Sequence, residues 1–209
     1  DIWIDIGEVI SVADQMGWDR FSLIGHSRGA AIAGLIAGTY ADRVAQLALI
    51  DGYVPMPSEA DDAAKQLKKA IRENKRFANS QPTFFPDFEK AIQARVKGFV
   101  PLQQEAAALL AKRGVSEGSR GFYWANDQRL KAASFVKFSK DYLEGFFTSI
   151  LARVLLIQAE NSALSPGRQQ NALFEWIRHM EIQKVSGSHH LHLEGEAEDV
   201  ARLIQKFLV

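Results

Sequence analysis

The stretch LIGHSRGA, residues 23–30, changes from strand-like to helix-like sequence around a single serine. Residues 20–25 form a short apolar run, which is typical of a buried β-strand, and residues 30–38 are small and apolar, which favours a closely packed helix. The pattern G-x-S-x-G lies at the junction, at residues 25–29. A strand-to-helix turn this tight predicts that side chains at Gly25 and Gly29 would collide with their neighbours.

Three further apolar runs indicate that this strand belongs to a parallel sheet. Each run shows little alternation, as is typical of strands that are buried on both faces. Segments with helical spacing separate most of them, so the chain has an α/β pattern. The runs are RVAQLALID (43–51), RVLLIQAE (153–160) and MEIQKVSG (180–187), and the helices are expected within 1–20, 27–42, 165–180 and 195–208.

The segment from residue 55 to residue 150 has a different composition and is predicted to be a helical cap over the sheet. It contains no strand-like run, and helix formers and aromatic residues dominate it. The predicted organisation is therefore a core of residues 1–54 and 151–209, with a cap of residues 55–150 inserted between them. The expected helices of the cap are 58–77, 86–99, 104–113 and 139–150, with a loop at 114–121.

The first strand run is expected to lie at an edge of the sheet. Right-handed crossovers would add the strands in sequence order, which leaves residues 20–25 as a bare apolar edge of the kind that natural sheets avoid. The chain also enters helical sequence at its first residues. We therefore expect further strands, either preceding Asp1 or supplied by a separate chain, to complete the sheet.

Composition and charge argue against several classes of partner. The 209 residues include 25 Lys plus Arg and 25 Asp plus Glu, so no overall field attracts nucleic acid or an anionic membrane surface. No apolar stretch is long enough to span a bilayer, and the first residues are not expected to form a leader. The absence of cysteine excludes disulfides and thiolate chemistry. A small-molecule partner is expected, and the predicted location is cytoplasmic.

Several segments together resemble the α/β-hydrolase fold, and within it the serine hydrolase-like family of capped hydrolases. The resemblance extends over nearly the whole chain, and its most specific parts are the first and last of the segments. It implies that Ser27 is a nucleophile, with the N–H of Arg28 as one donor of an oxyanion hole. The second donor belongs to a loop that precedes Asp1 in this fold. The segments are GHSRG (25–29), LALIDG (47–52), GFYWANDQRL (121–130), RVLLIQAE (153–160) and GSHHLHLE (187–194).

A serine hydroxyl needs a base, and similar hydrolases take a histidine from a loop near the C-terminus. GSHHLHLE places His189 at that position, with His190 as the alternative. His189, His190 and His192 could instead ligate a metal, but no matching ligand pattern occurs elsewhere in the sequence. His26, beside the serine, is predicted to be a packed or hydrogen-bonded core residue. No metal or organic cofactor is expected.

The acid that orients the histidine departs from the usual pattern. Similar hydrolases carry an aspartate a few residues after the strand at 153–160, whereas this chain has Ser162 and Ala163 there. Asp51 ends the strand that follows the nucleophile, and some relatives of the fold take their acid from that strand. We favour Asp51 as the acid, with Glu160 as the alternative.

These residues predict a serine hydrolase of small to medium, largely apolar esters or related acyl compounds, acting through an acyl-enzyme on Ser27. A serine nucleophile argues against dehalogenase and epoxide hydrolase chemistry, which use a carboxylate on the same fold. Hydrolysis of carbon–carbon bonds is one alternative. A catalytically silent ligand-binding protein on the same scaffold is the other, because the usual acid is missing near Ser162.

Overall fold

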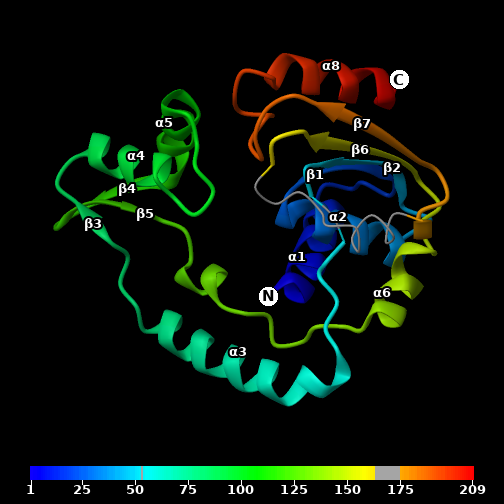
Figure 1. Ribbon diagram of the computed structural model, residues 1–209, viewed down its shortest axis with the longest axis horizontal. Helices are drawn as coiled ribbons and strands as arrows, with labels where there is room; N and C mark the ends of the chain where they lie inside the picture. Colours follow the sequence, from blue (N-terminus) through cyan, green and yellow to red (C-terminus); the bar gives the residue numbers. More distant parts are fainter. Residues whose placement is uncertain (53, 163–174) are drawn as a thin grey trace. The chain divides into compact units, whose positions relative to one another are not determined.

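The computed structural model describes residues 1–52, 54–162 and 175–209, and the chain divides into two compact units (Figure 1). The sheet unit contains Asp1–Ala63 and Lys137–Val209. The insertion contains Ala64–Val136. Among the helices that the structure describes, none is long and apolar enough to cross a membrane.

A four-stranded parallel sheet organises the sheet unit, with the strand order β1-β2-β6-β7. These strands are the four predicted apolar runs, so the predicted sheet and the sequential order of its strands are confirmed. Their bounds are β1 (Phe21–His26), β2 (Val44–Ile50), β6 (Arg153–Ala159) and β7 (Met180–Val185).

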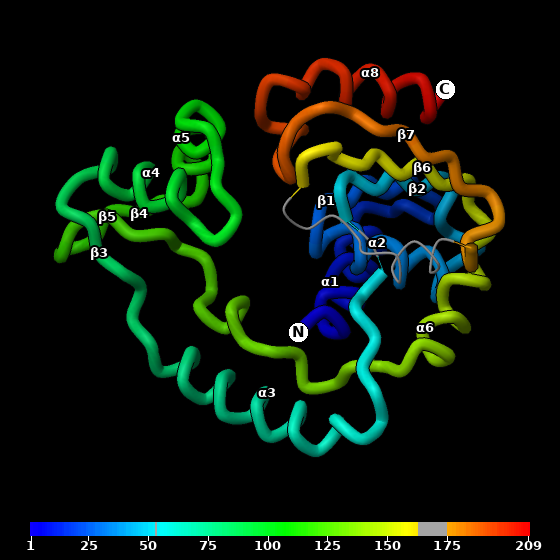
Figure 2. The backbone as a smooth tube through the Cα atoms, viewed as in Figure 1, coloured from blue at the N-terminus to red at the C-terminus, as the bar shows by residue number. Residues whose placement is uncertain are grey.

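Helices cover both faces of this sheet (Figure 2). Leu47 and Leu49 of β2 belong to the core formed with α1 (Ile2–Gln15), α2 (Arg28–Thr39) and α6 (Lys140–Phe147). Ala48 and Ile50 point the other way, into the core formed with α8 (Ala197–Leu208). Because both faces of β2 and β6 are buried, their sequences are continuous apolar runs rather than alternating ones.

β1 forms one edge of the described sheet, since its partner there is β2 alone. The side chain of Ile24 on this strand is 53% exposed. The first strand run therefore has the edge position expected for it. That further strands or a separate chain complete the sheet stays a prediction.

The insertion combines helices with a small antiparallel sheet in the order β3-β5-β4. The predicted absence of strands from this segment is wrong, and so is the loop at residues 114–121. These strands have only two to four residues and are at most half-buried, so they leave no continuous apolar run in the sequence. The elements are α3 (Ala63–Ala78), β3 (Phe84–Phe85), α4 (Phe88–Val96), α5 (Gln104–Gly114), β4 (Val115–Gly118), β5 (Gly121–Trp124) and the 3-10 helix η2 (Gln128–Lys131). The 3-10 helix η1 (Ala60–Asp62) comes just before them and lies in the sheet unit.

The sequence predicts a cap at residues 55–150, whereas the second compact unit of the structure contains Ala64–Val136. Helix α6 buries Leu143 and Phe147 in the same core as α2. A Cβ atom on Gly34 of α2 would lie 2.7 Å from the Phe147 ring, so the two helices are in close contact. The apolar face of α6 therefore makes it part of the sheet unit. Most of the helix expected at residues 165–180 lies outside the described residues.

Candidate active site

Ser27 occupies the turn between β1 and α2, with φ 54° and ψ −119°. A positive φ is costly for a residue that carries a side chain, and it persists only where the surroundings enforce it. The Ser27 N–H donates to the carbonyl of Ile50 over 3.1 Å, and the Ser27 carbonyl accepts from the N–H of Ala30 over 3.0 Å. These bonds hold the strained turn and place the hydroxyl at the carboxyl end of the parallel strands.

The glycines around Ser27 do not all serve the same purpose. A Cβ on Gly25 would lie 2.5 Å from the backbone oxygen of Gly29, so the collision predicted there is confirmed. The collision predicted at Gly29 is wrong, because no atom beyond the adjacent backbone of its own helix lies within 4 Å of a Cβ at that position. Gly52, which the sequence did not single out, would place a Cβ 2.5 Å from the Ser27 carbonyl oxygen. The tight approach is therefore between the serine turn and the end of β2.

Ser27, His189 and Asp51 form one chain of hydrogen bonds, although they come from distant parts of the sequence. The Nε2 of His189 lies 2.9 Å from Ser27 Oγ, and its Nδ1 lies 2.7 Å from Asp51 Oδ2. His189 is 3% exposed and Asp51 is 1% exposed. Because the Asp51 carboxylate accepts from Nδ1–H, Nε2 is left free of a proton and can accept from the serine hydroxyl.

The Asp51 carboxylate also accepts hydrogen bonds from two groups other than His189. The donors are the Ser162 hydroxyl at 2.5 Å and the N–H of Ala159 at 3.0 Å. Burial by itself would raise the pKa of Asp51, but the bonds from His189, Ser162 and Ala159 outweigh it and lower the pKa below its ordinary value. Asp51 is therefore ionised at neutral pH and can stabilise a protonated His189.

The structure does not bring Glu160 to the histidine. Its side chain is exposed just after β6, and its N–H donates to the carbonyl of Val185 over 2.9 Å. Ser162 occupies the place where an aspartate was expected, and it donates to Asp51 instead. Sequence reasoning missed this role because the two residues are 111 positions apart. Of the two candidate acids, Asp51 alone reaches His189.

The loop after β7 is closed by its own residues, which fixes the position of His189. Gly187 has φ 106°, and a Cβ there would lie 2.6 Å from the Glu196 carboxylate. The Ser188 hydroxyl donates to Glu194 Oε2 over 2.5 Å, and the N–H of Leu193 donates to the carbonyl of His190 over 2.8 Å. A positive φ at the start and two internal bonds therefore make this loop a compact support for the imidazole.

Four histidine rings gather around the site. The Nε2–H of His26 donates to the carbonyl of His189 over 2.9 Å, which agrees with the hydrogen-bonded position expected for His26. The His26 ring lies 4.0 Å from that of His192, and the ring of His190 stands edge-on to His189 at 4.9 Å. In the part of the chain that the structure describes, no group of three potential ligands is arranged to hold a metal ion.

Burial changes the protonation of this cluster. It lowers the pKa of His26, and it lowers the pKa of His192 to about 4, with the neighbouring charges of His26 and His189 acting in the same direction. Both rings are therefore neutral at pH 7. A neutral His26 can donate through Nε2–H without adding a positive charge beside His189.

Arg28 is the first residue of α2. Its side chain makes a structural contact, and its backbone N–H is available at the start of the helix. The guanidinium forms an ion pair with Asp5 of α1. The first N–H groups of a helix have no acceptor within the helix, and the helix dipole makes this end favourable for negative charge. The backbone N–H of Arg28 is therefore suited to stabilise an oxyanion formed at Ser27.

Comparison with known proteins identifies relatives over almost the entire chain. A family model described as alpha/beta hydrolase fold matches residues 6–196. A serine hydrolase-like protein of Danio rerio is 28% identical over 97% of this chain, and serine hydrolase-like protein 2 of Homo sapiens is 26% identical over 97%. The chain spans 65% of the length of the first and 69% of the second.

Solved structures confirm the fold. A hypothetical protein of Pseudomonas aeruginosa PAO1 superposes with a TM-score of 0.93 at 36% identity, covering 100% of this chain and 74% of that one. A thioesterase domain from the curacin biosynthetic pathway superposes with a TM-score of 0.78 over 98% of this chain and 72% of that one. Its identity of 20% shows a shared fold alone.

Proposed function

The chain belongs to the alpha/beta hydrolase fold family, and on that premise we propose that Ser27, His189 and Asp51 are a catalytic triad that hydrolyses esters or related acyl compounds. The supporting observation is the continuous pair of hydrogen bonds, 2.9 Å from Ser27 Oγ to His189 Nε2 and 2.7 Å from His189 Nδ1 to Asp51. This is the arrangement in which a histidine can activate a serine and an aspartate can hold the histidine in the required tautomer.

Acylation follows from this geometry. His189 Nε2 removes the hydroxyl proton while Ser27 Oγ forms a bond to the acyl carbon, and the electron pair of the carbonyl bond moves to its oxygen. The N–H of Arg28 stabilises that oxyanion, and ionised Asp51 stabilises the imidazolium. As the carbonyl re-forms, the bond to the leaving alcohol breaks, and His189 gives its proton to the departing oxygen. The products are the alcohol and an acyl group on Ser27.

Deacylation repeats the same steps with water. His189 removes a proton from the water as its oxygen attacks the acyl carbon, and it returns that proton to Ser27 Oγ when the ester bond breaks. The carboxylic acid leaves and the free serine is restored. No step requires a metal or an organic cofactor, since the proton carrier and the nucleophile both belong to the chain.

The substrate proposal is a small to medium acyl compound whose acyl group is largely apolar. It is supported by the zero net charge of the chain and by the aromatic residues of the insertion. That aromatic residues of the insertion roof the substrate site stays a prediction. The serine at position 162, which suggested a silent binding protein, is no reason against catalysis because Asp51 supplies the acid next to it.

The proposal is tested by following p-nitrophenyl esters with acyl chains from acetate to decanoate. We expect the unmodified chain to hydrolyse at least one of them, and Ser27→Ala and His189→Ala to lower kcat about 10⁴-fold or more. Glu160→Gln is the matched control and should stay within about twofold, since its carboxylate is exposed and away from the triad. Equal rates for the unmodified chain and Ser27→Ala, with both folded, would contradict the proposal.

A further inference from the structure

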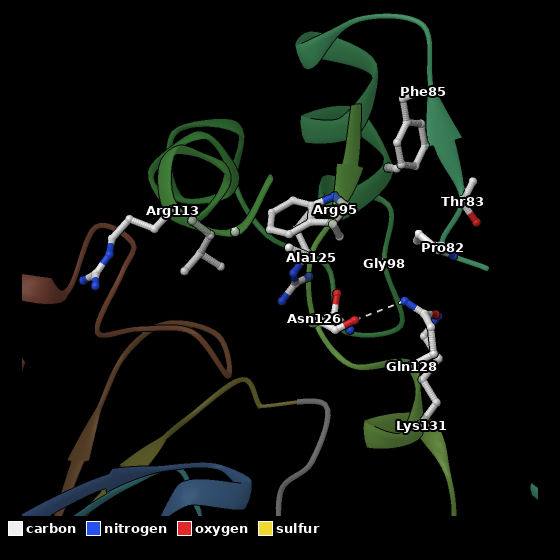
Figure 3. A pocket seen from close by; sticks show the side chains of 14 residues that line it. Pro82, Thr83, Phe85, Arg95, Gly98, Arg113, Ala125, Asn126, Gln128 and Lys131 are labelled. Carbon is white, nitrogen blue, oxygen red and sulfur yellow. Dashed lines mark hydrogen bonds between the residues drawn. The ribbon is translucent and has the colours of Figure 1, made fainter. Parts of the chain in front are cut away.

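A cavity of about 1050 Å³ lies within the insertion (Figure 3). Its walls come from α4, α5, the end of β5, η2 and the segment before β3, all of which belong to the insertion. Pockets for small ligands are usually about 300–1,000 Å³, so this one is large enough for a drug-sized molecule.

The charges along this cavity are of one sign. Arg95 and Lys131 line it, and none of the described residues that line it is Asp or Glu. Arg113 also lines it, but in Figure 3 its side chain extends away from the other labelled residues. Asp127, next to the lining in sequence, is held by the guanidinium of Arg129, with 2.9 Å between Arg129 Nε and Asp127 Oδ2. The charged side chains that line the cavity are therefore all cationic, which favours a negatively charged ligand.

Each of the two cations donates to a neutral acceptor. Lys131 Nζ donates to the amide oxygen of Gln128 over 2.6 Å, and Arg95 Nη1 donates to the carbonyl of Val100 over 2.9 Å. The Gln128 amide oxygen is neutral, so this bond does not cancel the positive charge of Lys131. Burial lowers the pKa of Arg95, which reflects the partial removal of its guanidinium from water. A partly desolvated guanidinium binds an anion more strongly than one in open water.

The apolar part of the wall is held in place by packing. The indole Nε1–H of Trp124 donates to the carbonyl of Ala91 over 3.0 Å, which ties β5 to α4. A Cβ on Gly114 would lie 2.8 Å from the Trp124 ring, so the ring packs directly on α5. Phe85 and Leu110 complete the apolar surface. The lining thus combines a packed apolar wall with cationic groups.

From this combination we propose that the insertion has its own binding site for an amphipathic anion, with the negative group between Arg95 and Lys131 and the apolar body against Phe85, Leu110 and Trp124. The ligand class is a carboxylate or sulfonate on an aromatic or aliphatic body. An apolar carboxylic acid, the product class of the proposed reaction, has this chemistry. The site itself requires no catalysis and does not depend on the proposed function.

The test uses two fluorescent probes that share an aromatic body, and it is carried out on the full chain. Anilinonaphthalene sulfonate carries a negative group, and N-phenyl-1-naphthylamine is its uncharged counterpart. We expect the sulfonate to bind and to be displaced by decanoate but not by decanol. Its affinity should fall as salt is added, because screening weakens its attraction to the cations.

Substitutions assign the site. Lys131→Gln should weaken the decanoate-displaceable sulfonate binding about fivefold, as expected for an exposed charge. Arg95→Gln should weaken it about tenfold, because its group is partly desolvated. Lys112→Gln is the matched control: it removes a cation from α5 that does not line the cavity, and it should change the affinity less than twofold.

Two outcomes would overturn the proposal. The first is unchanged sulfonate binding in both Lys131→Gln and Arg95→Gln. The second is an equal loss of the uncharged naphthylamine in these variants, which would mean that the charge is not what is recognised. Thermal unfolding of each variant shows whether it is folded, and the two substitutions act on different elements, so the failure of one still leaves the other as a test.

Discussion

The proposed triad of the sheet unit and the cavity of the insertion hold their charged groups in opposite ways. Asp51 and His189 are 1% and 3% exposed, and each atom that would take part in the reaction has a fixed partner. At the cavity, Lys131 is exposed and Arg95 is half-buried, and both donate to neutral groups. A preorganised buried site loses much when one group changes, whereas cations near water can readjust. Single substitutions should therefore have large effects at the triad and small ones at the cavity.

The two units also differ in their response to acid. All five histidines lie outside residues 64–136, and four of them gather at the triad. The insertion has no side chain whose ordinary pKa lies between pH 5 and 8. Mild acid should therefore act first on the sheet unit.

The largest effect on activity is expected from a substitution of Asp51, the buried acid. Asp51→Asn keeps the shape of the side chain but removes the charge that orients His189, and it should lower kcat about 10³- to 10⁴-fold for an ester that the unmodified chain hydrolyses. Glu160→Gln should leave kcat within about twofold. If Glu160→Gln lost as much activity as Asp51→Asn, the assignment of the acid would be wrong.

The next effect compares one glycine from each unit. Gly25→Ala forces a Cβ against the backbone oxygen of Gly29 and should cost about 3 kcal/mol of unfolding free energy, because a backbone atom cannot move aside. Gly114→Ala meets the ring of Trp124 and should cost about 1 kcal/mol, since a side chain can shift. Gly29→Ala has open space and is the control. Urea unfolding measures all three, and equal losses at Gly25 and Gly29 would contradict this account.

A smaller effect is expected from the hydrogen bond between the His26 ring, beside Ser27, and the His189 carbonyl. His26→Leu removes the donor to the His189 carbonyl, and it should lower kcat about tenfold with little change in KM. His26→Gln can place an amide N–H near the same position and should recover kcat to within about threefold of the unmodified chain. A kinetic comparison in which both variants lose activity equally would show that this bond does not position His189.

The smallest effect concerns pH. The pKa of His192 is about 4 in the folded chain, against an ordinary value of 6.5, so between these two pH values the unfolded chain takes up a proton that the folded chain does not. Stability should therefore fall as the pH drops from 6.5 to 4, and the loss should end below pH 4. His192→Phe should remove on the order of 1 kcal/mol of this loss, a figure reduced for the partial exposure of the ring.

Urea unfolding at a series of pH values measures this effect. The titratable groups around the His192 ring are His26, His189, His190 and Glu194, and they are unchanged in the variant. The pKa of His26 is lowered as well, so part of the acid sensitivity should persist in His192→Phe. Identical pH dependence in the two proteins would show that His192 does not take part.

The parts of the fold that the sequence predicts are those in which one physical requirement dominates. β2 and β6 are buried on both faces, so their residues must be largely apolar and the run is plain in the sequence. Gly25 is needed because backbone approaches backbone, and Ser27 stands next to it at a turn between a strand and a helix. These requirements are local, and they place the proposed nucleophile, Ser27, without knowledge of the rest of the chain.

The parts that sequence reasoning missed depend on distant partners. β3 and β5 are short and half-buried, and their pairing of Phe84 with Tyr123 joins segments far apart in the chain. Helix α6 has the helical spacing of the cap, but its contacts with α2, at Gly34 among others, show that it belongs to the sheet unit. The bond between Ser162 and Asp51 likewise exists only once the strands are paired. Local sequence patterns cannot predict contacts between residues that are far apart in the chain.

The most direct test of the central claim is reaction with a fluorophosphonate, followed by mass spectrometry of the intact chain and of its peptides. We expect one covalent adduct, located on Ser27, that forms rapidly in the unmodified chain and is lost in His189→Ala. No adduct on the folded chain, or an adduct on another residue, would contradict the proposal that His189 activates Ser27.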